Sequence, residues 1–174
     1  MATTIATSKD DDIRILIEDL DLDPIKVKLL DPEDGAGWNL LKVEDVERRY
    51  RKFLFLNHKH PESTVVPSKD VDKFWHYHIL DTRKYADDCQ KIFGYFLHHF
   101  PYFGMRGDED AYQLQDAFRQ TNDMFYREFG EKLSSVSSAW CSSECSSKEC
   151  GTCGPRVSEG NVSARPRFNR ENYH

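Results

Sequence analysis

Apolar and aromatic residues recur at steps of three and four between residues 71 and 96, a spacing typical of one face of an α-helix. The members of this stripe are Val71, Phe74, Trp75, His78, Ile79, Thr82, Tyr85, Ala86, Cys89, Ile92, Phe93 and Phe96. So wide and aromatic a stripe does not suit an isolated surface helix. We therefore predict one central helix from Ser68, a good N-cap, to Gly94, or as far as His99, because Pro101 stops any helix.

Shorter helical patterns lie on both sides of this stretch. They cover about residues 10–20, 24–30, 43–57 and 108–133. Pro24 stands at the first position of the second pattern, where its missing N–H costs nothing. Together these patterns predict an all-α domain over residues 10–133, built as a small bundle of four to five helices.

The two ends of the chain differ in composition from this domain. Residues 1–9 are small and polar, and we expect them to be disordered. At Ser134 the composition changes abruptly, because eight of the fourteen residues from 134 to 147 are serine. Such a segment buries too little apolar surface to offset its ordering entropy. We predict a flexible, Ser/Cys-rich tail over residues 134–174.

Charge and hydropathy exclude several classes of protein. The net charge is −6, whereas a nucleic-acid binder or a protein that binds anionic lipid needs a basic surface. No apolar run approaches the ~18 residues of a membrane span, and the first residues have no signal-peptide pattern. We expect a cytoplasmic protein whose partner is a small molecule or another protein, and neither nucleic acid nor a membrane.

Six of the seven histidines lie between residues 58 and 99, which suggests a metal site. Asp72 and His76 are four apart and share a helix face, whereas His76 and His78 diverge by about 200° on a regular helix. His78 also lies on the apolar stripe, so burial should lower its pKa. Imidazole ligands favour zinc, iron or copper. The candidate ligands are His78, His76, His98, His99, Asp72 and His58.

Each of these histidines also has a purely structural interpretation. His78 can be a buried residue hydrogen-bonded to a neighbour such as Tyr85, and His76 a surface residue paired with Asp72. His98 and His99 can be packing residues among the aromatic side chains around them. The adjacent pair Asp87 and Asp88 point about 100° apart on a helix, which does not suit a catalytic carboxylate pair, and we expect both to be solvated.

The cysteines suggest a second site. Cys141, Cys145, Cys150 and Cys153 match the four thiolates of a tetrahedral zinc site, although their spacing is tighter than that of a zinc ribbon. The alternative is a tail that binds soft metals only opportunistically. Cys89 lies on the apolar stripe and is expected to be a small core residue.

A motif in the central stretch carries a family resemblance. Its residues are Trp75, His76, His78, Tyr85, Asp88, Cys89 and Gly94, followed by His98 or His99. The motif, within about residues 13–133, resembles the glycine-rich domain-containing protein-like family. The larger plant members have a long glycine-rich extension where this chain has the Ser/Cys-rich tail. The resemblance implies a shared helical domain and a role for the WHxH residues, but no particular activity.

Two functions remain open at this point. The first is a histidine-based metal-binding protein, which would be a metal-dependent enzyme if a substrate reaches the ion. The alternative is a non-catalytic protein–protein interaction module whose WHxH residues are structural. Catalysis without metal has little support, because the chain lacks a GxSxG motif and a glycine-rich phosphate loop.

Overall fold

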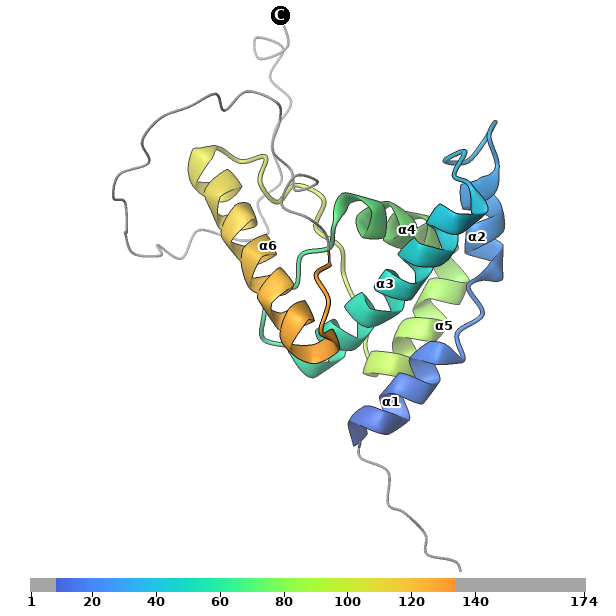
Figure 1. Ribbon diagram of the computed structural model, residues 1–174, viewed down its shortest axis with the longest axis horizontal. Coiled ribbons are helices and arrows are strands. Elements are labelled where there is room, and N and C mark those ends of the chain that lie inside the picture. Colours follow the sequence, from blue (N-terminus) through green and yellow to red (C-terminus); the bar gives the residue numbers. More distant parts are fainter. Residues whose placement is uncertain (1–8, 134–174) are drawn as a thin grey trace, which may run out of the picture.

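The computed structural model describes residues 9–133, and every regular element within that range is a helix (Figure 1). The helices are α1 (Lys9–Glu18), α2 (Asp23–Leu30), α3 (Leu40–Lys59), α4 (Lys69–Leu80), α5 (Thr82–Phe93) and α6 (Asp108–Phe129). The all-α prediction is confirmed, with six helices instead of four or five. Disorder is predicted for residues 1–9, but Lys9 begins α1, and residues 1–8 and the predicted tail at 134–174 lie outside the described residues.

The predicted single helix from Ser68 to Gly94 is wrong, because it consists of two helices that meet at Asp81. The ψ angle of Asp81 is 72°, outside the helical region, and this residue ends α4 and precedes α5. Both helices turn their apolar face to the same core, so the spacing of apolar residues continues across the break. The predicted ends are confirmed: the Ser68 side chain caps α4, and Gly94 ends α5 with a φ of 76°.

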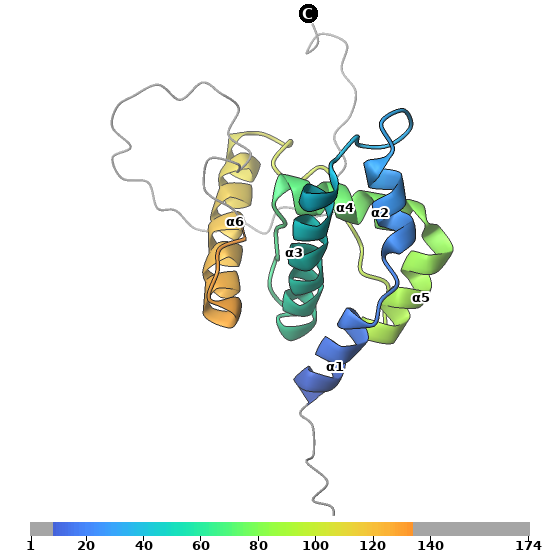
Figure 2. The ribbon, with the colours of Figure 1, turned by 45° about the vertical axis from the view of Figure 1, so that its right-hand side comes forward.

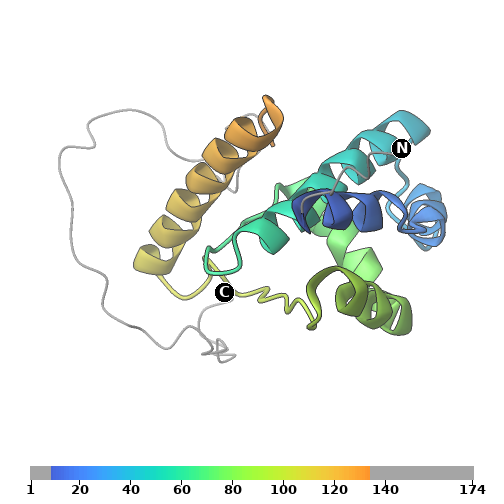
Figure 3. The ribbon, with the colours of Figure 1, turned by 90° about the horizontal axis from the view of Figure 1, so that it is seen from below.

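The centre of the bundle is α3, and not the helical stretch of residues 68–94 that the sequence predicts. Helices α1, α2, α4 and α6 all pack against α3, while α5 packs on α4 and α1 (Figures 1 and 2). The buried face of α3 includes Val43, Val46, Tyr50, Phe53, Leu54, Phe55 and Leu56. Seen from below, α6 lies to one side of the other helices and is reached through an irregular segment after α5 (Figure 3).

A buried hydrogen-bond network joins α3, α4 and α5 around His78, whose exposed fraction is 1%. Its Nδ1 atom lies 2.9 Å from the hydroxyl of Tyr50, and its Nε2 atom lies 3.1 Å from Oδ2 of Asp88. An ionised carboxylate can only accept, so Nε2–H donates to Asp88 and Nδ1 accepts from Tyr50. Both ring nitrogens of His78 therefore have protein partners.

The expectation that Asp88 is solvated is wrong, because its exposed fraction is 4%. Its carboxylate accepts from Lys84 at 2.8 Å, one helical turn earlier, and from Lys91 at 3.5 Å. Burial alone would raise the pKa of Asp88, but the hydrogen bonds from Lys84 and His78 and the charge of Lys84 outweigh burial and lower it. The expectation of a solvated side chain is confirmed for the neighbouring Asp87, which is exposed.

Burial lowers the pKa of His78 to about 4, and the nearby charge of Asp88 offsets only part of this shift. A lowered pKa in the folded state means that the unfolded chain binds the proton first as the pH falls. The stabilising effect of the neutral ring is complete above about pH 6.5 and is lost between that pH and about pH 4. The prediction that burial lowers this pKa agrees with the structure.

We therefore expect the unfolding free energy of the wild-type protein to fall by about 2 kcal/mol more than that of His78→Gln between about pH 7 and about pH 5. Urea unfolding at both pH values measures this difference. His98→Gln, at an exposed histidine, should keep the wild-type dependence on pH. Equal pH dependence in the wild-type protein and His78→Gln would show that His78 protonates normally in the folded state.

Candidate metal centre

The irregular segment between α5 and α6 brings a second group of histidines back across α4. Tyr85 of α5 anchors this segment, because its hydroxyl donates to the carbonyl of Leu97 at 2.6 Å. The same hydroxyl accepts from the indole N–H of Trp75 in α4 at 2.8 Å. These two bonds connect α4, α5 and the segment two residues before His99, so they fix where that histidine can lie.

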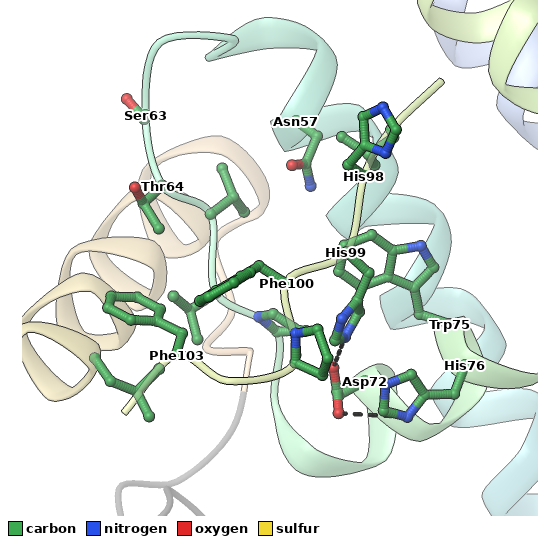
Figure 4. A pocket seen from close by; sticks show the side chains of 16 residues that line it. Asn57, Ser63, Thr64, Asp72, Trp75, His76, His98, His99, Phe100 and Phe103 are labelled. Carbon is green, nitrogen blue, oxygen red and sulfur yellow. Dashed lines mark hydrogen bonds and ion pairs between the residues drawn. The ribbon is translucent and has the colours of Figure 1, made fainter. Parts of the chain in front are cut away.

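Asp72, His76 and His99 come together at the surface of α4 (Figure 4). Asp72 Oδ1 lies 2.8 Å from Nε2 of His99, and Asp72 Oδ2 lies 3.7 Å from Nδ1 of His76. One donor atom from each of the three side chains lies within 4.8 Å of the other two. The exposed fraction of the side chain is 14% for Asp72 and His99 and 46% for His76, so the group is open to solvent on one side.

The spacing of these atoms suits one divalent ion. Ligand atoms about 2.0 Å from a tetrahedral zinc ion are about 3.3 Å apart. The two separations from Asp72, one from each of its carboxylate oxygens, lie on either side of this value. Two imidazoles and one carboxylate also form the ligand set of non-haem iron(II) sites with open coordination positions. In the absence of an ion, the Asp72 carboxylate can hold His99 by a hydrogen bond.

A pocket of about 320 Å³ adjoins this cluster (Figure 4). Its walls come from Asn57 of α3, from α4, from the loop between α3 and α4, from the segment after α5, and from Leu114 of α6. The aromatic residues Trp75, Phe100 and Phe103 line it, and the Trp75 ring lies 4.5 Å from that of His99, centroid to centroid. An ion held by the cluster would therefore lie in the wall of an apolar pocket.

The structure separates the six predicted ligands into several places. His78 belongs to the buried network with Tyr50 and Asp88, so the predicted divergence of His76 and His78 is confirmed. His98 lines the same pocket as His99 but points away from Asp72, with its ring 4.9 Å from that of Phe96 (Figure 4).

His58 lies in the last turn of α3, outside the cluster of Asp72, His76 and His99. Partial burial lowers the pKa of His58, against the opposing charge of Asp10 in α1. Cys89 is buried and free, as expected of a core residue. The proposed thiolate ligands Cys141, Cys145, Cys150 and Cys153 lie outside the described residues, and that second site stays a prediction.

Sequence reasoning missed the groups that position these histidines. Tyr50 was not connected with His78, and nothing in the sequence signals a contact between residues 28 positions apart. The anchoring role of Tyr85 was missed for the same reason. Asp88 could have been found, because Lys84 at four residues before it and Lys91 at three residues after it are helical neighbours of opposite charge.

Comparisons with known proteins show which family this chain belongs to. Glycine-rich domain-containing protein 1 of Arabidopsis thaliana is 31% identical over 94 residues, which are 52% of this chain and only 11% of that relative. No solved structure matches the chain. None of the helices α1–α6 is long and apolar enough to cross a membrane. A model of the UCP032817-like family matches residues 17–133, so the resemblance to glycine-rich domain-containing proteins is confirmed and the chain belongs to the UCP032817-like family.

Proposed function

We propose that this domain binds one divalent transition-metal ion through Asp72, His76 and His99. The observation that carries the proposal is the convergence of three metal-binding side chains, from α4 and from the segment after α5, with donor atoms within 4.8 Å of one another. His78 is left out of the ligand set because both of its ring nitrogens have protein partners.

Among zinc, iron and copper, the ligand chemistry favours zinc or iron(II). Two imidazoles and a carboxylate suit both ions, and neither needs a sulfur ligand. Copper(I) prefers thiolate or thioether ligands, and the cluster contains none. Copper(II) binds nitrogen ligands more strongly than zinc does, so it is the competing ion in any binding assay.

The pocket beside the cluster supports a catalytic role in addition to metal binding. Three protein ligands leave at least one coordination position of the ion free. An ion with a free position can polarise a carbonyl group or lower the pKa of a bound water molecule. Because the cluster lies in the pocket wall, a small molecule in the pocket would reach that position.

The alternative function, an interaction module with structural WHxH residues, has support at two of the three motif positions. Trp75 and His78 are buried, and each donates a hydrogen bond inside the domain. His76 is different, because 46% of its side chain is exposed beside Asp72. We therefore assign a structural role to Trp75 and His78, and metal binding to His76.

Elemental analysis and calorimetry test the metal site in the full chain. We would replace the four tail cysteines Cys141, Cys145, Cys150 and Cys153 by serine, purify without an affinity tag, and remove metal with a chelator. Zinc should then bind at one ion per chain. Asp72→Asn, His76→Ala and His99→Ala should each weaken zinc binding at least about tenfold.

The matched control is His98→Ala, because His98 is adjacent in sequence and lines the same pocket but lies outside the cluster. It should bind zinc like the parent protein. Zinc binding that is not stoichiometric, or that His98→Ala weakens as much as His99→Ala does, would contradict the proposal. In that case the bond between Asp72 and His99 would serve only to hold the segment after α5.

A second prediction concerns Tyr85 as a positioning residue. Tyr85→Phe removes the hydroxyl that the indole of Trp75 and the carbonyl of Leu97 share, and leaves both groups without this partner. We expect a loss of about 1–3 kcal/mol in unfolding free energy. Zinc affinity should also fall several-fold, because His99 is held less firmly.

Tyr112→Phe is the control for this prediction, since Tyr112 is 59% exposed on α6. It should change neither the stability nor the zinc affinity. A Tyr85→Phe variant that loses stability but binds zinc with unchanged affinity would show that Tyr85 supports the fold alone.

A further inference from the structure

We propose that the pocket beside Asp72, His76 and His99 binds a small aromatic anion, whose charged group completes the coordination of the metal ion and whose ring lies among Trp75, Phe100 and Phe103. This inference rests on the metal site proposed above. It adds the class of molecule that the site accepts.

The volume of the pocket fits a ring with one short substituent. An apolar cavity of about 150 Å³ is enough to hold benzene. The pocket measures about 320 Å³, at the lower end of the range for small-molecule sites. It therefore has room for one ring and a chelating group, and little room for a larger ligand.

The lining of the pocket is suited to a ring. Apart from the three aromatic residues, its apolar members are Val65, Val66, Pro67, Leu97, Pro101 and Leu114. Trp75 connects the two halves of the site, because its indole lies in this lining and also contacts the ring of His99. A ring that packs on Trp75 would lie next to the ion, with its substituent directed at the coordination position that the protein leaves free.

The charge of the site selects an anion. Among the residues 9–133 that line the pocket, Asp72 is the one carboxylate, and none is a lysine or an arginine. A divalent ion bound to one carboxylate and two neutral imidazoles has a net charge of about +1. A single negative group on the ligand neutralises that charge, which matters in an apolar pocket because an unpaired charge there is costly. Without the ion, the Asp72 carboxylate repels the same ligand.

Two chelators that differ only by a ring test this proposal on the full chain with the four tail cysteines replaced by serine. Benzohydroxamate carries a phenyl ring where acetohydroxamate carries a methyl group. Calorimetry would measure the binding of each to the zinc-loaded and to the metal-free protein. Desalting after the titration would show that zinc remains bound at one ion per chain.

We expect benzohydroxamate to bind the zinc-loaded protein at least about tenfold more tightly than acetohydroxamate, because its ring becomes buried. Neither compound should bind the metal-free protein. Phe100→Ala should weaken benzohydroxamate binding about fivefold and leave acetohydroxamate binding unchanged. Tyr95→Ala, at an exposed aromatic residue of the same segment that does not line the pocket, should alter neither.

The outcomes separate this inference from the metal site on which it rests. If zinc binds through Asp72, His76 and His99 but the two hydroxamates bind equally well, the aromatic pocket is overturned and the metal site stands. If benzohydroxamate binds the metal-free protein as tightly as the zinc-loaded protein, its anionic group does not bind the ion, and this inference is overturned. If zinc does not bind at one ion per chain, the metal site and this inference fall together.

Discussion

The buried hydrogen bonds of His78 fix how α4 is rotated in the bundle. The apolar face of α4 selects the side that is buried, and His78 adds a directional constraint, because turning the helix would break its hydrogen bonds with Tyr50 and Asp88 and leave buried polar groups unpaired. With His78 turned inward, residues at about 200° from it point out of the core. His76 does so, and Asp72, one turn before it, lies on the same face. The core network and the candidate site thus lie on opposite faces of α4, and the same orientation of this helix positions both.

The residues of the WHxH motif therefore differ in burial and in role. Trp75 and His78 hold helices together, and Trp75 also reaches the pocket, where its ring meets that of His99. His76 contributes nothing to the buried core. A motif of four residues can thus bring a structural network and a surface cluster into a fixed relation, because neighbouring positions on a helix face in different directions.

The sequence predicts the parts of this structure that depend on local spacing. The Ser68 cap, the end of α5 at Gly94 and the opposite directions of His76 and His78 follow from helix geometry. The break at Asp81 does not, because apolar spacing reports which face is buried and not whether the axis is straight. The choice between His98 and His99 is also beyond the sequence, since an irregular segment has no period from which to read a direction.

The position of α6 has a consequence for the shape of the pocket. Its last turns pack on α3, where the rings of Phe129 and Phe55 lie 6.1 Å apart. Nearer its start, Leu114 lines the pocket, and Thr121 accepts a hydrogen bond from the backbone N–H of Val66 in the loop before α4. The pocket thus lies between α6 on one side and α4, the loop before it and the segment after α5 on the other. A change in how α6 packs on α3 would therefore alter one wall of the pocket, while the core network of His78, which α3, α4 and α5 build, would keep its hydrogen bonds.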